Sequence, residues 1–516
     1  MNKYDSMIAC NKKASEEKVN RAVTEIRQML TEREKVTVPK LTKRTGLSRG
    51  FFYKNETVRK EMDRALEQQA GMIDPKRYIG DIVLKNRIPT FGQLIAEPAF
   101  VLIDTAIVGH IGGQALAGLS VGSTIVLTVV GLCVFLAYST TSQVGRLLGA
   151  GKRREGLEAG VDGLWLAGII GVVVSVALFV IARPLCMAMG AQGSVLHNAV
   201  DYVRAVVFGI PGMLLVYAAN GIFRGLQKVR ITLVAATLGA ILNTLLDLLF
   251  ILGFGWGVFG SGVATLISQW FMAVVLIVPA VLWTRAEGAR LRPRLSGVLN
   301  SAGDGAVLFL RTLALRACLV ANVVLATHMG VEVLAAYQVV NSSWNFVLNM
   351  LDAIGIAGQT LVAAQIGARQ EDEAMRLTRI AGRAGLCGGT VIGIGLMIAG
   401  WCASPLFSQS IEIQHLLTVG MVVVGVTLPL AGWMWAVDGI LIGAGDYRYL
   451  ALTCTATAAI YVPCLAVIGW ICDAMQASSA LRMALLWLAV NLLFVGLRAI
   501  FNGSRIGTST WLHIAH

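Results

Sequence analysis

Twelve apolar segments, each long enough to cross a lipid bilayer as a helix, follow one another along most of this chain. The hydrocarbon core of a bilayer is spanned by about 20 helical residues, and every backbone amide in it must bond within the chain. Of the 516 residues, 56% are hydrophobic and 14% are charged, which excludes an ordinary soluble protein. The sequence therefore predicts an all-α polytopic membrane protein. The segments are residues 88–110, 116–142, 162–182, 200–224, 231–254, 261–283, 305–329, 334–362, 384–403, 416–443, 450–471 and 480–501.

The basic residues between these segments predict how the chain is oriented. Cytoplasmic loops carry the excess of Lys and Arg, and here the even-numbered connections collect them. Both termini, including a tail at residues 506–516, are therefore expected in the cytoplasm, and the protein is expected in the cell (inner) membrane. The residues concerned are Arg146, Lys152, Arg153, Arg154, Arg224, Lys228, Arg230, Arg285, Arg290, Arg292, Arg294, Arg369, Arg376, Arg379, Arg383 and Arg448.

An internal repeat relates the two halves of the membrane part at a constant offset of 218 residues. Agreement between scarce residue types at one offset indicates a duplicated unit. Each copy contains six segments, an even number, so both copies enter the membrane in the same direction and are related by a pseudo-two-fold axis along the membrane normal. We expect an N-lobe at residues 80–295, a C-lobe at residues 296–505 and a cavity between or within them. Matched pairs include Gly149 with Gly367, His197 with His415, Pro211 with Pro429, Gly221 with Gly439 and Arg230 with Arg448.

Carboxylates inside the N-lobe spans are candidates for binding a transported cation. Asp104 and Asp247 each lie about 16 residues into a span that runs outward, so at about 1.5 Å per residue they reach a similar depth. An Asp at the centre of a membrane helix costs about 2.5–3.5 kcal/mol and usually faces the bundle interior. Asn243, one turn before Asp247, could hold a proton or coordinate an ion. Glu97, next to Pro98, either carries the cation or fixes a hinge in the first span.

Protonation from outside would remove the charge of Asp104 and Asp247 and let the first and fifth spans repack. Release of the proton to the cytoplasm would reset the lobe. The alternative is that each acid only accepts hydrogen bonds between helices.

The C-lobe carries a different set of charges. Asp352 in the eighth span and Asp438 in the tenth are cavity candidates, and Arg311 and Arg316 lie in the seventh. An unpaired cation in the bundle is costly, so these arginines are expected to pair with one of the two acids; the alternative is that they bind an anionic substrate. Asn322 stands at the repeat position of the acid in the first span, so only the N-lobe keeps that acid.

Residues 1–79 form a separate polar head with 18 Lys and Arg and 11 Asp and Glu. The pattern VTVPKLTKRTGLSRGFFYKN predicts a helix-turn-helix and resembles the DNA-binding helices of small transposon-encoded accessory proteins. Arg49, Tyr53 and Lys54 would lie on the helix that faces the groove. A solvated helical bundle without a DNA target is the alternative. The predicted helices are residues 15–33, 38–44, 49–54 and 56–69, with Thr37 and Ser48 as caps and a turn at Gly46.

Several stretches of the membrane part resemble the MATE (multidrug and toxic compound extrusion) transporters, in particular their DinF-like branch. They are EPAFVLIDTAIVGHIGG, ALAGLSVG, ILNTLLDLLFILGFGWGVFGSGVATLIS, RTLALRA and LDAIGIAGQTLVAAQIGA, and the resemblance covers residues 82–505. It implies twelve spans in two lobes and cation-driven export of organic compounds by alternating access. It also implies coupling acids at Asp104 and Asp247. The sodium-coupled branch has a carboxylate in span 7, where this chain carries two arginines, so we expect the coupling ion to be H⁺ rather than Na⁺.

The sequence thus predicts a proton-coupled exporter of small, cationic organic compounds. No nucleophile with its base, metal cluster or phosphate loop is present, so we expect neither an enzyme nor a cofactor or bound metal. The expected partners are the substrate and membrane lipids, with nucleic acid reached only through residues 1–79, and the protein is expected to be a monomer. Two rival functions are a lipid or oligosaccharide flippase of the same superfamily and a membrane-tethered DNA-binding regulator.

Overall fold

The computed structural model describes residues 17–29, 32, 36–55, 57–59, 61–62, 65, 113–407 and 410–514. These residues form helices, turns and connections, and none of them lies in a β-strand. The chain divides into two compact units, Met1–Lys85 and Asn86–His516. The predicted first span, and with it Glu97 and Asp104, lies outside the described residues.

The first unit contains the predicted helix-turn-helix. A helix at residues 17–29 precedes α2 (Val38–Thr45) and α3 (Arg49–Lys54). Gly46 separates α2 from α3 at φ +72°, a left-handed conformation that glycine adopts without a Cβ penalty. Thr37 and Ser48 take the predicted N-cap positions, but neither side chain makes the capping hydrogen bond. A small core holds these helices together: Ala22, Ile26, Met29, Val36, Leu41, Phe52, Val58, Met62 and Ala65.

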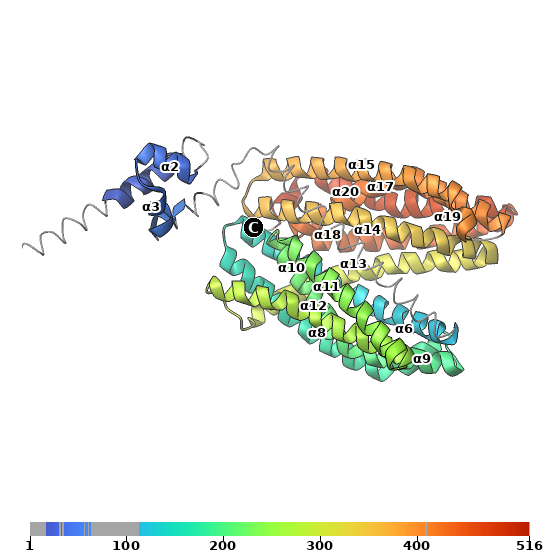
Figure 1. Ribbon diagram of the computed structural model, residues 1–516. Helices are drawn as coiled ribbons and strands as arrows, with labels where there is room; N and C mark the ends of the chain where they lie inside the picture. The colour runs from blue at the N-terminus through green and yellow to red at the C-terminus, as the bar shows by residue number, and fades with distance from the viewer. Residues whose placement is uncertain are drawn as a thin grey trace, which may run out of the picture. The chain divides into compact units, whose positions relative to one another are not determined.

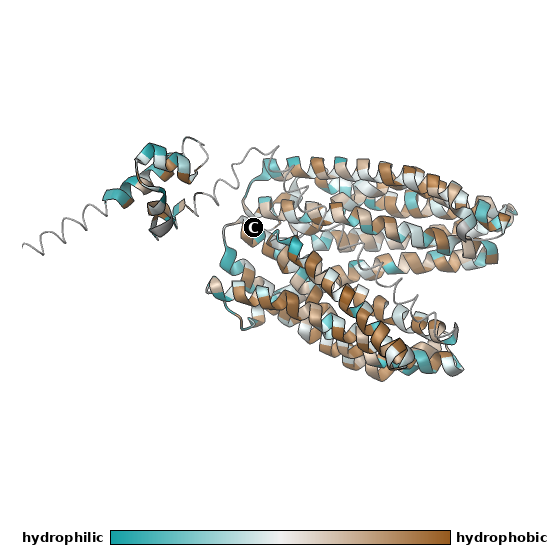
Figure 2. Ribbon diagram, in the orientation of Figure 1, coloured by the Kyte–Doolittle hydropathy of each residue, from teal (hydrophilic) through white to brown (hydrophobic). Residues whose placement is uncertain are grey.

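Within its described residues, the second unit contains eleven helices that are long and apolar enough to cross a membrane (Figure 1). Hydrophobic residues cover most of their length (Figure 2). They correspond in order to predicted spans 2 to 12. Their bounds are Gln114–Gly149, Arg153–Ala188, Gly193–Gly225, Val229–Gly253, Gly257–Ala286, Leu295–His328, Val331–Gly367, Glu371–Cys402, Ile411–Ala444, Tyr447–Ala474 and Ser479–Gly507.

Four of these spans are interrupted. Span 2 consists of α6 (Gly113–Leu132) and α7 (Phe135–Gly149), and span 4 consists of α9 (Gly193–Val206), a 3₁₀ turn and α10 (Ile210–Gly225). Pro211 in the first turn of α10 has no backbone N–H to continue the helical pattern of α9. Span 5 passes from α11 (Val229–Asp247) into the π-helix η2 (Leu248–Gly253). Span 12 contains α19 (Ser479–Leu488), the π-helix η3 (Ala489–Phe494) and α20 (Val495–Gly507).

In the N-lobe, α10 packs against α7, against α8 (Arg153–Ala188) and against α12 (Gly257–Ala286). Glycines allow these close approaches: a Cβ on Gly221 would lie 2.7 Å from Thr140 Cβ, and one on Gly171 would lie 2.6 Å from Pro211 Cα. Small residues at helix crossings are the usual means of packing helices within a bilayer, where the lipid removes the hydrophobic drive between them.

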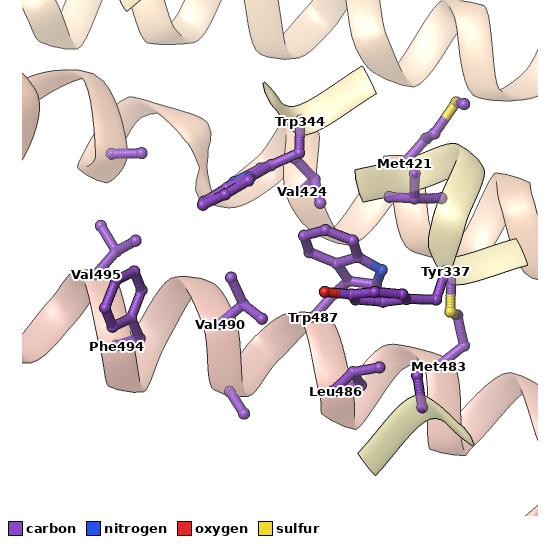
Figure 3. Packing of buried hydrophobic residues seen from close by; sticks show 14 of the residues in the cluster. Tyr337, Trp344, Met421, Val424, Met483, Leu486, Trp487, Val490, Phe494 and Val495 are labelled. Carbon is purple, nitrogen blue, oxygen red and sulfur yellow. The ribbon is translucent and has the colours of Figure 1, made fainter. Parts of the chain in front are cut away.

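In the C-lobe, α17 (Ile411–Ala444) is the central helix and packs against α14 (Val331–Gly367) and α15 (Glu371–Cys402). An aromatic cluster fills the space between α14, α17 and span 12 (Figure 3). In it, the rings of Tyr337 and Trp487 stack with centroids 5.4 Å apart, and Trp344 lies 6.1 Å from Trp487. These three aromatic residues belong to the core and do not line the cavity at the lobe seam described below.

The two lobes meet along α7 and α14, which occupy equivalent places in the repeat. Gly149 packs against the backbone of Ala364, and Gly367 packs against the backbone of Arg146. At the 218-residue offset, Gly149 corresponds to Gly367 and Arg146 corresponds to Ala364. The contact is therefore symmetric. It lies at the end of the bundle that carries the even-numbered connections, and from there the lobes diverge toward the opposite end (Figure 1).

Candidate functional site

Asp247, the predicted coupling acid of span 5, is the last residue of α11 and is fully buried. With its amide oriented to satisfy both neighbours, Asn243 donates from Nδ2 to Asp247 Oδ2 (3.2 Å) and accepts from the backbone N–H of Thr265 (3.2 Å). The amide of Asn243 is thus within reach of the carboxylate, and the predicted role of the two in holding a proton or an ion stays a prediction. Asn243 ties the carboxylate of α11 to α12, because Thr265 belongs to that helix.

The π-helix η2 begins directly after Asp247. A π-turn inserts an extra residue into the helical pattern and is frequent at functional sites, because it turns a side chain away from its regular helical direction. No sequence signal pointed to this interruption, since the residues that follow Asp247 are the apolar run LLFILG.

The C-lobe positions that correspond to Asp104 and Asn243 carry different side chains. Asn322 of α13 (Leu295–His328) is buried and accepts a hydrogen bond of 2.6 Å from the Tyr461 hydroxyl of α18 (Tyr447–Ala474). At the 218-residue offset, Asn322 corresponds to Asp104 and Tyr461 corresponds to Asn243. The C-lobe therefore has a neutral hydrogen bond where the N-lobe sequence places an acid and an amide.

A cavity of about 200 Å³ lies where the C-lobe faces span 2. It contains charged, aromatic and small residues from five spans, and all four predicted C-lobe candidates line it. The structure thus brings together the acids and arginines that the sequence placed in three different helices. The lining residues with polar or aromatic side chains are Tyr138, Arg311, Thr312, Arg316, Asp352, Gln359, Trp435, Asp438 and Arg498.

Asp438 is the centre of a buried ion cluster on one wall of this cavity. Its Oδ2 accepts from the guanidinium of Arg311 and lies 3.2 Å from Nη2 of Arg498, and its Oδ1 accepts from Asn502 Nδ2 at 3.1 Å. The guanidinium of Arg498 also lies over the ring of Trp435, 5.1 Å from its centroid. The predicted pairing of Arg311 with an acid of the C-lobe is therefore confirmed.

Arg316 is different. It is exposed, lines the cavity, and forms no ion pair with any residue in the described part of the chain. The expectation that it pairs with Asp352 or Asp438 is wrong. The reason is geometric: Arg316 reaches toward span 2, where a Cβ on Gly131 would lie 3.1 Å from its Nη2.

Asp352 lines the same cavity from α14, together with Tyr138 of span 2. Its neighbour Gln359 donates to the backbone carbonyl of Tyr138 at 2.9 Å. The cavity therefore lies at the seam between the lobes, and side chains of both contribute to it.

Sequence reasoning missed Arg498. Arg498 lies within span 12 and is buried, and Arg224, which was expected in a connection, is buried in the last turn of α10. The signal was present, because Arg498 interrupts the apolar run NLLFVGLRAIF. Its pairing with Asp438, 60 positions earlier in another span, was not visible in the sequence.

A second cavity of about 580 Å³ lies between the lobes at the end with the even-numbered connections. Gln143 of α7 donates to Asp304 of α13 across it, with 3.1 Å between Nε2 and Oδ2. Arg146 donates to the carbonyl of Gly443 (3.5 Å), and Ser142 bonds to the hydroxyl of Tyr447. These polar contacts join span 2 to three spans of the other lobe.

In the first unit, Arg49 is exposed at the start of α3, as a groove-facing residue requires. The side chains of Tyr53 and Lys54 lie outside the described residues. In the described part of both units, no group of three or more His, Cys, Asp and Glu side chains is placed to hold a metal ion.

Comparisons with known proteins match this architecture. The profile of the MatE family matches residues 89–249 and 308–468, one match in each half of the repeat and together more than half of the chain. A family of unknown function, DUF6262, matches residues 3–97.

Individual relatives agree with the family match. DETOXIFICATION 44, a chloroplastic protein of Arabidopsis thaliana, is 28% identical over 449 residues, 84% of this chain and 83% of its own. DNA damage-inducible protein F (DinF) of Escherichia coli is 26% identical over 422 residues, 80% of this chain and 89% of its own. The fold matches the crystal structure of a MATE transporter from Vibrio cholerae with a TM-score of 0.75 at 19% identity, covering 84% of this chain and 98% of that one. The chain described here belongs to the MATE family of multidrug and toxic compound extrusion transporters and has a DinF homologue.

Proposed function

We propose that this MATE transporter exports organic compounds in exchange for protons, with Asp104 and Asp247 as the proton carriers. The observation that carries the proposal is the buried carboxylate of Asp247, held by Asn243 and followed at once by a π-helix. A charged carboxylate in a membrane span is costly, so binding a proton there changes the energy of the lobe substantially. A coupling site must link proton binding to the conformation of the lobe in this way.

The repeat supports the pairing of the two acids. Asn322 and Tyr461 are in hydrogen-bond contact in the C-lobe, and they correspond to Asp104 and Asn243. If spans 1 and 5 pack as spans 7 and 11 do, Asp104 lies beside Asn243 and, through it, near Asp247. Duplicated units usually keep the packing of their helices even where side chains diverge.

In the proposed cycle, protons reach the two acids from outside and neutralise them. Spans 1 and 5 then repack, the substrate is released outward, and the protons leave toward the cytoplasm after the lobes have changed their relative position. We place both termini and the even-numbered connections in the cytoplasm and the protein in the cell membrane, following the distribution of basic residues. The lobe contact at Gly149 and Gly367 then lies on the cytoplasmic side, which corresponds to a state closed toward the cytoplasm.

The test is proton-driven uptake into inverted membrane vesicles with an acidic lumen. The probes are ethidium, p-aminohippurate, succinate and tricarballylate, so that coupling is tested without assuming the charge of the substrate. Asp247→Asn and Asp104→Asn should each reduce proton-driven uptake to the level of vesicles that lack the protein. Exchange of labelled for unlabelled substrate without a pH gradient should persist, because neutral asparagine leaves the cavity intact.

Asp201→Asn is the matched control. Asp201 is an acid of span 4 that is partly exposed and lies 3.3 Å from His197, so its loss should leave uptake unchanged. Proton-driven uptake that survives in both Asp104→Asn and Asp247→Asn would contradict the proposal. Uptake that is driven by an imposed Na⁺ gradient and does not respond to the pH gradient would show that the coupling ion is Na⁺ and not H⁺.

A second candidate function concerns the first unit alone. The observed turn at Gly46 between α2 and α3, with Arg49 exposed on α3, favours DNA contact by this unit. A gel shift with residues 1–85 on duplex DNA should show binding that weakens steeply with salt, and Arg49→Ala should reduce it. Absence of any shift at low salt would contradict DNA binding and leave the unit as a solvated helical bundle.

A further inference from the structure

We propose that the cavity at the lobe seam binds a carboxylate group of the transported compound and that Arg316 is the residue that binds it. This inference rests on the proposed transport function and deepens it, because it names the substrate class of the same protein as organic anions. It departs from the cationic substrate that the sequence analysis expected.

The first argument is the charge around the cavity. Among the residues that the structure describes, three guanidinium groups line it, those of Arg311, Arg316 and Arg498, and two carboxylates, those of Asp352 and Asp438. The formal charge of these five side chains is therefore one positive charge in excess. Because Arg316 is exposed where it lines the cavity, its charge is open to a ligand, and one carboxylate would neutralise the excess.

The second argument is the location of the excess positive charge. Both oxygens of Asp438 are engaged, because Oδ2 accepts from Arg311 and pairs with Arg498, and Oδ1 accepts from Asn502. Arg316 is left with no ion-pair partner in the described part of the chain and with its guanidinium facing the cavity. A guanidinium binds a carboxylate through two parallel N–H donors, which a cationic or neutral compound cannot use.

The third argument is position. Arg316 belongs to the C-lobe but reaches to Gly131 in span 2, so a carboxylate bound to it lies at the seam between the lobes. The apolar part of the compound would meet the aromatic ring of Trp435 and the side chains of Leu315 and Ile356, which line the same cavity. A bound anion can thus influence how closely the lobes approach.

The test compares purified full-length protein and three variants. Arg316→Gln removes the charge, and Arg316→Lys keeps the charge but loses the two-donor geometry. Arg204→Gln is the matched control, because Arg204 lies within span 4 over the ring of Phe179, 5.5 Å from its centroid, and does not line the cavity. The probes are p-aminohippurate, succinate and tricarballylate, with ethidium as the cationic comparison.

We expect the carboxylates to raise the melting temperature of the wild type and of Arg204→Gln in a concentration-dependent way. Arg316→Gln should weaken carboxylate binding by about tenfold to a hundredfold, as expected for the loss of a charge-assisted hydrogen bond, and Arg316→Lys should lie in between. Because Arg316 is exposed, both variants should melt like the wild type without ligand, which separates lost binding from lost folding.

Three results would contradict either carboxylate binding at Arg316 or proton coupling. Proton-driven uptake of ethidium, with no uptake of or stabilisation by any carboxylate, would overturn the inference and leave proton coupling standing. Carboxylate binding that is unchanged in Arg316→Gln would overturn the assignment of the site. Conversely, Arg316-dependent carboxylate binding without proton-driven uptake of any probe would support the inference and contradict proton coupling.

Discussion

The side chain of Asp438 illustrates how this protein keeps charge inside a membrane bundle. The carboxylate is buried, and so are Arg311 and Arg498, which flank it. Taking such groups out of water costs several kcal/mol for each ion, about the size of their attraction, so the cluster adds little net stability. Removing one member is different, because its partners stay buried without a counter-charge.

Asp438→Asn should therefore destabilise the protein strongly, by about 3–5 kcal/mol, since two buried guanidinium groups lose their counter-ion. Thermal unfolding of the purified protein in detergent measures this. Asp473→Asn provides the comparison: Asp473 is 69% exposed and pairs with Arg482 at 3.1 Å, and such surface pairs contribute less than about 1 kcal/mol. Equal melting temperatures for the two variants would show that the Asp438 cluster is not held together by charge.

At the scale of helices, the crossing of α7 and α14 brings the backbones of the two lobes into direct contact. Each helix presents a glycine to the backbone of the other, Gly149 to Ala364 and Gly367 to Arg146. A Cβ at either glycine would overlap a backbone carbonyl oxygen, which is rigid and cannot move aside as a flexible side chain would. The two helices must separate to admit it.

Gly149→Ala and Gly367→Ala should each disfavour the closed contact by about 1–3 kcal/mol, the usual range for overpacking. Both should slow transport and lower the melting temperature, by similar amounts, because the contact is symmetric. The double variant should cost less than the sum of the two, since both changes open one contact. Gly395→Ala is the control: it lies in α15 with no atom within 4 Å of the added Cβ, and it should behave like the wild type. Normal transport in both interface variants would contradict a role for this crossing in the cycle.

At the scale of the whole molecule, the two lobes share one architecture and divide the chemistry. The N-lobe keeps the buried acid Asp247 beside the amide of Asn243, whereas in the C-lobe the counterpart of Asn243 is Tyr461, which bonds to the neutral Asn322. Arg311, Arg316 and Arg498 belong to the C-lobe and line its cavity. In this arrangement the proposed proton site and the proposed anion site lie in different lobes, and the α7–α14 crossing links the lobes that contain them.

Much of the fold follows from the sequence alone. Apolar segments of membrane length set the number and order of the described spans, because backbone amides inside a bilayer must bond within their own helix. The 218-residue repeat implied two equivalent lobes, and the paired contacts of Gly149 and Gly367 agree with it. The spacing of Asn243 and Asp247 by one helical turn placed both on one face of the helix, and the structure has their side chains in hydrogen-bond contact.

Tertiary structure decided the rest. Which arginine pairs with Asp438 depends on how spans 7, 10 and 12 pack, and no local pattern encodes the approach of Arg498 from the last span. The exposure of Arg316 follows from the direction in which α13 turns it, toward the other lobe and away from the acids. Periodicity along one helix fixes which residues share a face. Which face meets which, and therefore which charges remain for a ligand, is settled only by the packing of helices that are distant in the chain.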